Sequence, residues 1–474
     1  MDEILKSRYK CSSYGELAQR VSHTVGRTIK EKEFYLELMN KKLFCPAGNT
    51  LLAGCVDGEE AEILVTPNCS VLEPINEENY DSLIKRCKVL WTNRVGIGFD
   101  LSTAKDPVSI LKKLSMVNSG IKLGHRPQRG NMAVCKDTHP KIDEFILCKQ
   151  SENDLYNFNI SVGITDSSNV DEEMLNLMSK ASWGKGDPGI LFLDRLQGVS
   201  GANENDLQLI HSRIGKVNTV VPCGELPLYA DGVCTLGSVN LGSKLFWSRE
   251  DGFDEVLFEK VVRGGVRFLD RVVDIMAGSL SEVGLESMAE NNLYSRRIGL
   301  GIMGWADALN HAGIQYGSEE SYALAHRIGT IFKNASNGES NIMGRQYGRA
   351  PVLEGTTLTR RHLMIHAFPP TGGLTLLMGN KGYGIEPFFS DAADITPHEH
   401  LKMQSVWQHY NDSSISKTVN MSNKTTPNEI KSVWKAAMSI NLKSVTIYRD
   451  GSHLDQPLTV GINKQDCPRG VCSL

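Results

Sequence analysis

The sequence lacks the features that mark membrane, secreted and DNA-binding proteins. No apolar run approaches the ~18 residues that a membrane-spanning helix needs, and the first residues lack the apolar core of a signal peptide. Lys and Arg together number 51 and Asp and Glu 55, so the formal charge of −4 argues against direct DNA binding. We therefore expect a cytoplasmic protein without a membrane segment.

Internal repeats and low-complexity linkers are also absent from the 474 residues, which favours one continuous domain over several. Hydrophobic residues make up 41% and charged residues 22%, as is typical of soluble globular proteins. The pattern predicts a short helical region over residues 1–44, a large domain over 45–453 and a flexible tail over 454–474.

Within the large domain, short apolar runs bounded by Gly, Pro or Asn alternate with longer segments of helical periodicity. We expect strands at residues 63–65, 158–162, 189–193 and 444–448, and helices at 81–94 and 255–276. Strands that alternate with helices indicate an α/β sheet or barrel.

The eleven cysteines are odd in number, and a cytoplasmic protein of this length needs no disulfide framework. Cys223 follows Pro222 and is followed by Gly224 and Glu225. In an extended segment residues i and i+2 point to the same side, so we expect Cys223 and Glu225 to share one cavity. A thiol beside a carboxylate suits hydrogen or proton transfer, whereas a buried packing cysteine in a loop is the alternative interpretation.

Four further cysteines have positions suited to redox chemistry. Cys69 is expected at the end of an apolar strand, and Cys234 in a turn that leads into another strand. Cys467 and Cys472 form a C-x4-C pair near the C-terminus. A zinc site would need four ligands, and no second close pair of Cys or His supports one. We therefore favour thiol–disulfide exchange from the tail, and no bound metal in this chain.

Several motifs follow one another along the chain, namely Asn159-Ile160-Ser161-Val162, Gly186-Asp187-Pro188-Gly189, Pro222-Cys223-Gly224-Glu225, Cys234-Thr235-Leu236-Gly237-Ser238, Arg296-Arg297-Ile298-Gly299, Pro370-Thr371-Gly372 and Gly384-Ile385-Glu386-Pro387. They resemble, in the same order, motifs of the catalytic subunits of ribonucleotide reductases. The chain resembles this family over most of residues 40–474. More narrowly, it resembles a minimal, phage-type form with motifs of the adenosylcobalamin-dependent group, acting in the cytoplasm of a cell or a phage-infected host.

The resemblance implies a ten-stranded α/β barrel of the ribonucleotide reductase and glycyl-radical type, with a short N-terminal helical region. It also implies an oxidoreductase that reduces ribonucleoside di- or triphosphates to 2′-deoxyribonucleotides for DNA synthesis by thiyl-radical chemistry. Because relatives carry Asn where this chain has Val221, a nucleotide-binding homologue of altered activity is the alternative.

Carried over by position, Cys223 resembles the residue that becomes a thiyl radical and abstracts hydrogen from the ribose 3′ carbon. Glu225 resembles the carboxylate that takes the 3′-hydroxyl proton. Cys69 and Cys234 resemble the pair that supplies two electrons and ends as a disulfide. The tail cysteines Cys467 and Cys472 resemble the pair that reduces this disulfide and passes the oxidation to a thioredoxin- or glutaredoxin-type protein. The remaining six cysteines are expected to be packing residues.

A turn before an apolar helix offers free backbone amides and hydroxyls to an anion and resembles the loop that holds the substrate's phosphates. The expected substrate-binding residues are Pro370, Thr371, Gly372, Gly373 and Thr375 of this turn, with Thr50 and Asn68 as neighbours.

Three residues resemble the site of a deoxynucleotide effector. Asp81 corresponds to the start of that site, and Arg126 and Arg129 to the loop that reports which effector is bound. The family places these elements at a dimer interface, so a homodimer is implied. The loop after Phe99 is shorter than in relatives, and we expect effector control to be simplified.

The radical source has two interpretations. Tyr448 is a single tyrosine where oxygen-dependent relatives have an adjacent pair that relays the radical, and this resembles the adenosylcobalamin-dependent group. Minimal phage-type reductases share such motifs and pair with a ferritin-like, metal-containing radical subunit. Adenosylcobalamin, or no bound cofactor and a ferritin-like partner, therefore both remain open, with Tyr448 as the candidate radical relay.

Overall fold

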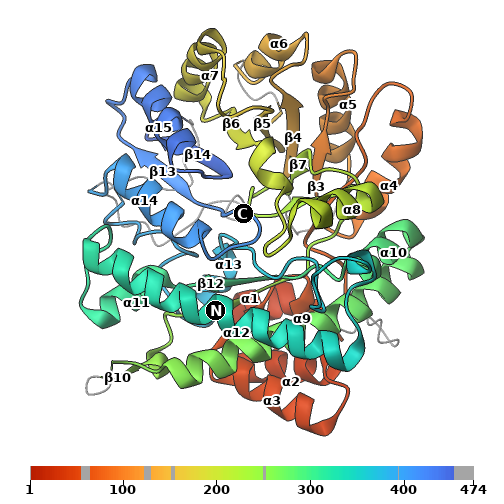
Figure 1. Cartoon of the computed structure of the whole chain (residues 1–474), viewed down its shortest axis with the longest axis vertical. Coiled ribbons are helices and arrows are strands. Elements are labelled where there is room, and N and C mark those ends of the chain that lie inside the picture. The colour runs from red at the N-terminus through yellow and green to blue at the C-terminus, as the bar shows by residue number, and fades with distance from the viewer. Residues whose placement is uncertain are drawn as a thin grey trace.

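The computed structural model describes residues 2–54, 65–121, 130–150, 155–248, 252–392 and 394–452 (Figure 1). The chain begins with helices α1 (Asp2–Tyr9), α2 (Tyr14–Val25) and α3 (Ile29–Asn40), as predicted. Helix α3 starts at a capping box in which Thr28 and Glu31 satisfy each other's backbone N–H groups. None of the helices in the described ranges combines the length and apolar character needed to cross a bilayer.

A seven-stranded sheet forms the larger half of the core, in the order β13-β14-β6-β5-β4-β3-β2. Its strands are β2 (Cys69–Val71), β3 (Gly96–Asp100), β4 (Asn131–Lys136), β5 (Phe158–Ile164), β6 (Gly189–Phe192), β13 (Thr418–Met421) and β14 (Ser444–Arg449). Neighbouring strands from β2 to β6 are parallel, as are β13 and β14, whereas β14 and β6 are antiparallel.

A three-stranded sheet, in the order β1-β9-β12, forms the smaller half. Its strands are β1 (Phe44–Pro46), β9 (Leu236–Asn240) and β12 (Gly299–Met303); β9 and β12 are parallel, and β1 runs antiparallel to β9. Single bridges connect the two sheets. Ser70 pairs with Val233 ahead of β9, Leu300 of β12 with His366, and Phe368 with Ile415 ahead of β13.

These connections arrange the strands as a ring. Leaving β1 aside, the two sheets contribute nine strands, and the segment 366–368 between β12 and β13 is the tenth. Strands β2 to β6 run in one direction, and β9, β12, the 366–368 segment, β13 and β14 run in the other. The predicted α/β fold is confirmed, with the nine strands and the 366–368 segment joined at three places by single bridges rather than by continuous ladders.

Helices surround this ring. On the side of β2 to β6 lie α4 (Tyr80–Thr92), α5 (Pro107–Ser119), α6 (Ile142–Leu147) and α7 (Glu172–Lys185) (Figure 1). Further along the chain come α8 (Glu204–Ile214), α9 (Glu255–Glu282), α10 (Glu286–Ser295), α11 (Trp305–Ala312), α12 (Glu319–Tyr347), α13 (Gly372–Met378), α14 (Pro397–Gln408) and α15 (Pro427–Ser439). The short strands are β7 (Thr219–Val220), β8 (Pro227–Leu228), β10 (Trp247–Ser248) and β11 (Gly252–Phe253), and the 3-10 turns are Thr50–Leu52, Leu193–Gln197, Lys244–Phe246 and Pro351–Leu353.

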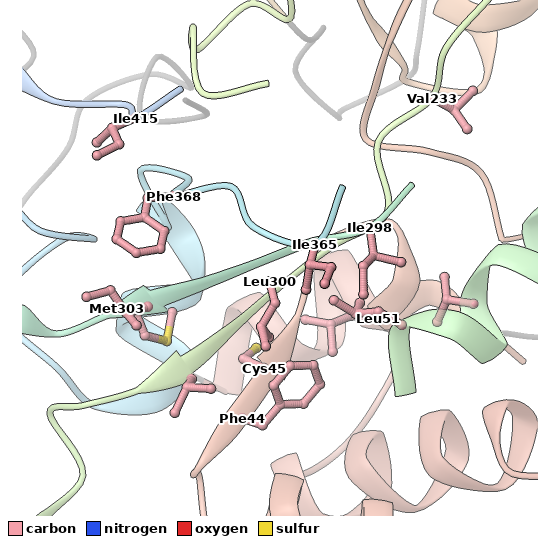
Figure 2. Close-up of a cluster of buried hydrophobic side chains, with 14 of the residues drawn as sticks. Phe44, Cys45, Leu51, Val233, Ile298, Leu300, Met303, Ile365, Phe368 and Ile415 are labelled. Carbon is pink, nitrogen blue, oxygen red and sulfur yellow. The ribbon is translucent and has the colours of Figure 1, made fainter. Parts of the chain in front are cut away.

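The main hydrophobic core packs against the three-stranded sheet and extends to β3, β4 and β5 of the larger sheet. Figure 2 shows Phe44 and Cys45 of β1 beside Leu300 and Met303 of β12. Helix α9 packs closely on this layer because Gly265 has no side chain, and a Cβ there would lie 2.9 Å from Leu300 Cδ1. This packing fixes β9 and β12, which support one side of the candidate site.

The predicted strands at 158–162, 189–193 and 444–448 correspond to β5, β6 and β14, and the predicted helices to α4 and α9. One strand prediction stays a prediction, and one was wrong in detail. Residues 63 and 64 lie outside the described residues, so the strand at 63–65 is not tested beyond Val65, which lies in irregular chain. Cys69 begins β2 rather than ending a strand, because the ladder to β3 starts only at the Cys69 pair with Gly96.

Candidate active site

The hairpin of β7 and β8 packs against the inner strands of the ring, next to β3 and β4 (Figure 1). Gly98 of β3 allows this approach, because a Cβ there would overlap the carbonyl oxygen of Val220. Asn159 Nδ2 of β5 donates to the carbonyl oxygen of Pro222 at 3.1 Å, and Ser414 N donates to the carbonyl oxygen of Glu225 at 2.9 Å. Backbone contacts from two sides of the ring therefore fix the tip of the hairpin.

The tip of this hairpin carries Cys223 and Glu225. Val221 N donates to Leu226 O at 3.1 Å, Gly224 N donates to Val221 O at 2.9 Å, and Gly224 has a φ of 79°. The segment is thus a tight turn that uses the conformational freedom of glycine, and the expectation of an extended segment was wrong. Both side chains nevertheless line one cleft, because the turn presents them to the same side.

Glu225 is buried, and burial raises the pKa of its carboxyl group from 4.5 to about 7. Its Oε2 atom has no hydrogen-bond partner among the described residues. A carboxyl group with a pKa near neutrality can both accept and donate a proton at physiological pH. This environment suits a proton-transfer role beside the partly exposed Cys223 thiol.

Cys69 and Cys234 lie directly opposite each other on antiparallel segments. Cys234 N donates to Cys69 O at 3.0 Å, and Cys69 N donates to Cys234 Sγ at 2.9 Å. The antiparallel Ser70–Val233 bridge sets this register. Directly opposite residues of an antiparallel pair lie within the Cα separation that a disulfide requires. Both cysteines are buried in a cluster that also holds Val221 and Leu236.

The cleft encloses about 720 Å³, part of it open to solvent. Eight residues predicted from the sequence line it, namely Asn68, Cys69, Pro370, Thr371, Gly372, Gly373, Cys223 and Glu225. The predicted Cys234, Thr50 and Thr375 do not: all three are buried, Cys234 beside Cys69. The candidate radical cysteine, the candidate proton acceptor and the candidate phosphate-binding loop come from distant parts of the chain and thus line one cleft.

The loop before α13 is held by its own hydroxyl groups. Thr371 has a φ of 57°, and its Oγ1 accepts a hydrogen bond from Gly384 N at 2.8 Å. It also shares a hydrogen bond with Thr375 Oγ1 at 3.1 Å. These two threonines therefore shape the loop, while Gly372 and Gly373 present its surface to the cleft.

Three cleft residues with polar side chains were not predicted from the sequence. Ser238 of β9 lines the cleft, and its buried hydroxyl has no hydrogen-bond partner among the described residues. It stands at the end of the Cys234-Thr235-Leu236-Gly237-Ser238 motif, so the motif could have indicated it. Arg8 and Tyr9 of α1 also line the cleft, but they precede the region of resemblance and no motif marks them.

The other predicted residues lie away from the cleft or outside the described residues. Asp81 is exposed in the first turn of α4. Tyr448 lies in β14, where burial raises the pKa of its phenol. Arg126, Arg129, Cys467 and Cys472 lie outside the described residues.

Several remaining cysteines sit in apolar surroundings. Cys45, Cys87 and Cys135 are buried, and Cys148 is partly buried. Burial raises the pKa of each of these four thiols to about 12, so they stay protonated and unreactive at neutral pH. This agrees with their predicted packing role.

Comparison with known proteins decides the family. A family model described as the barrel domain of ribonucleotide reductase matches residues 167–384 and 384–448. The chain belongs to the ribonucleotide reductase family. The match includes the Cys223 hairpin, β9, β12 and the loop before α13.

Two curated relatives are named vitamin B12-dependent ribonucleoside-diphosphate reductase. The protein of Thermoplasma acidophilum is 27% identical, and the alignment covers 90% of this chain and 66% of that protein. The protein of Mycobacterium tuberculosis strain H37Rv is 28% identical, with 76% and 61% covered. The chain thus spans less than two thirds of the length of either reductase.

A solved structure has the same fold over nearly the whole chain. The class Id ribonucleotide reductase alpha subunit of Actinobacillus ureae superposes with a TM-score of 0.79 at 15% sequence identity. The superposition covers 95% of this chain and 96% of that one. The barrel arrangement is therefore that of a ribonucleotide reductase alpha subunit.

Proposed function

We propose that the chain is a ribonucleotide reductase catalytic subunit that converts ribonucleotides to 2′-deoxyribonucleotides. The observation that carries this proposal is the meeting of Cys223, Glu225 and Cys69 in one cleft, with Cys234 directly opposite Cys69. A hydrogen-abstracting thiol, a proton acceptor and a two-electron dithiol are the three chemical groups that this reduction needs.

The proposed reduction begins at the 3′ carbon of the ribose. The Cys223 thiyl radical takes the hydrogen atom from the ribose 3′ carbon, and Glu225 accepts the 3′-hydroxyl proton. The 2′-hydroxyl then leaves as water after receiving one of the two dithiol protons. In all, Cys69 and Cys234 supply two electrons and two protons and become a disulfide. Return of the proton from Glu225 to the 3′ oxygen and of the hydrogen atom from Cys223 to the 3′ carbon completes the deoxyribonucleotide and restores the radical.

The pKa of Glu225 near 7 supports its role as the proton acceptor, because a large fraction of the group is ionised at neutral pH. Val221 is fully buried in the apolar cluster around the dithiol, and its aliphatic side chain cannot make the hydrogen bonds of the asparagine of relatives. Ser238 is the residue we propose for that role, because its hydroxyl lines the same cleft and has no hydrogen-bond partner among the described residues.

The substrate loop comprises Pro370, Thr371, Gly372 and Gly373, with Asn68 across the cleft. Thr50 and Thr375 act indirectly, since both are buried behind the cleft surface. The names of the relatives favour a ribonucleoside diphosphate as substrate.

The radical must reach Cys223 from outside the chain. Adenosylcobalamin, when bound, supplies a one-electron oxidant, and the relatives' names favour it. A ferritin-like partner subunit is the second candidate, for which Tyr448 of β14 would be the relay. Cys223 suits either source, because its side chain lies at a hairpin tip and is partly exposed.

The remaining parts of the proposal concern partners and regulation. A thioredoxin- or glutaredoxin-type protein renews the dithiol through Cys467 and Cys472, and a homodimer binds a deoxynucleotide effector near Asp81, Arg126 and Arg129. The protein acts in the cytoplasm. A nucleotide-binding homologue without reductase activity is the competing function, and Val221 is the residue that favours it.

The decisive experiment measures dCDP formation from CDP with dithiothreitol as reductant. One assay contains adenosylcobalamin, and the other contains a candidate ferritin-like subunit. We expect product in one of the two assays, and none from Cys223→Ser in either. Absence of product from the wild-type protein in both assays, with CDP still bound, would favour the non-catalytic homologue.

A further inference from the structure

Arg8 of helix α1 reaches the cleft from a region outside the family's motifs. It lines the cleft together with Cys223, Glu225 and Gly373. A Cβ built on Gly373 would lie 3.4 Å from Arg8 Nη1, so the guanidinium lies against the surface of the substrate loop. Among the described residues that line the cleft, Arg8 is the only one with a cationic side chain.

The position of Arg8 is fixed by the anchoring of its helix. Leu5 and Tyr9 of α1 are buried, and Cys11 N donates to Leu5 O at 3.1 Å. Arg20 of α2 clamps the end of the helix, because its Nη1 donates to Tyr9 O at 2.9 Å and its Nη2 to Leu51 O at 2.8 Å. Helix α1 is therefore tied to the wall of the cleft.

The guanidinium of Arg8 makes no hydrogen bond or ion pair with a described residue. The guanidinium makes a cation–π contact with the ring of Tyr9, whose centroid lies 5.7 Å from Arg8 Cζ. Arg20, in contrast, donates hydrogen bonds to backbone carbonyl groups. The donors of Arg8 are thus available to a molecule in the cleft.

We propose that Arg8 binds the phosphate groups of the substrate and makes the N-terminal helical region part of the substrate site. The inference rests on the proposed function, which places a phosphorylated ribose between the cysteines and the loop of Gly372 and Gly373. A guanidinium presents paired N–H donors that match phosphate oxygens, and such charge-assisted hydrogen bonds are stronger than neutral ones. Among the described residues that line the cleft, no other side chain offers those anionic oxygens a positive charge.

The test is equilibrium binding of CDP by titration calorimetry, without a radical source. We compare the wild-type protein with Arg8→Ala, Arg8→Lys and the control Lys6→Ala, which removes an exposed cation from the same helix. Arg8→Ala is expected to weaken CDP binding by about 10- to 100-fold, as loss of a charge-assisted hydrogen bond does. Arg8→Lys is expected to retain part of the affinity, and Lys6→Ala all of it.

Salt dependence separates a phosphate contact from a structural role. The CDP affinity of the wild-type protein should fall more steeply with salt than that of Arg8→Ala, whereas a loosened helix would leave the salt dependence unchanged. Binding of CDP by Arg8→Ala within twofold of the wild-type affinity, or an unchanged salt dependence, would overturn the inference. A wild-type protein that binds CDP through Arg8 but forms no dCDP would instead contradict the proposed function alone.

Discussion

The buried Glu225 is predicted to destabilise the folded protein when it ionises. Its pKa rises from 4.5 to about 7 on burial, so the folded protein holds this proton more tightly than the unfolded chain. The stability that the tighter proton binding of Glu225 contributes is complete below pH 4.5 and is lost as pH rises through 7. The shift corresponds to about 3 kcal/mol in total, of which about 2.5 kcal/mol develops between pH 5 and pH 8.

Glu225→Gln removes this titration while keeping the shape of the side chain. We expect its free energy of unfolding, relative to the wild-type protein, to increase by about 2.5 kcal/mol from pH 5 to pH 8. Urea denaturation at both pH values measures this difference, and the exposed Glu320→Gln is the matched control. The same variant should lose turnover, because a neutral amide cannot accept the 3′-hydroxyl proton.

Two results would refute this reasoning. One is a change in the free energy of unfolding by Glu225→Gln that is equal at pH 5 and pH 8. Such a result would mean that the carboxyl group is already fully ionised over this range. The other is a kcat/KM of the wild-type enzyme that does not rise with pH through about 7, because the proton acceptor must be ionised to act.

Four further predictions concern the hairpin, the dithiol, the ribose contact and the radical. Gly98→Ala should destabilise the fold by about 1–3 kcal/mol in denaturation, because its Cβ would displace the β7–β8 hairpin, whereas Gly278→Ala at an exposed position of helix α9 should be neutral or stabilising by up to about 1 kcal/mol. Thiol counting after a single turnover without reductant should show two thiols lost from the wild-type protein and none from Cys234→Ser; two lost from both would assign the electrons to another pair. Ser238→Ala should lower kcat by about tenfold if its hydroxyl orients the ribose, and an unchanged rate would exclude that role. Tyr448→Phe should abolish turnover if the wild-type protein works with a ferritin-like subunit and spare it if the protein works with adenosylcobalamin; retained turnover with the ferritin-like subunit would exclude the relay role, and lost turnover with adenosylcobalamin would assign Tyr448 a structural role.

Much of the fold was predictable because its elements carry local signals. The apolar runs at 158–162, 189–193 and 444–448 form β5, β6 and β14, since each run is bounded by residues that end strands. The motif at Cys223 and Glu225 pointed to one cavity, although the structure reaches it through a turn at Gly224 rather than through an extended strand. The alternation of side chains in a strand is a local rule, and it fails where a glycine reverses the chain.

The sequence by itself determined the α/β class, the redox-suited cysteines and the loop at residues 370–373, because residue type and spacing carry that information. Only the tertiary structure decided that Cys69 faces Cys234, that Glu225 is buried with a raised pKa, and that Arg8 reaches the cleft. These facts depend on strand register, burial and helix docking between segments far apart in the chain. Such contacts are set by the packing of the whole core, and no local pattern around Arg8 records its place in the cleft.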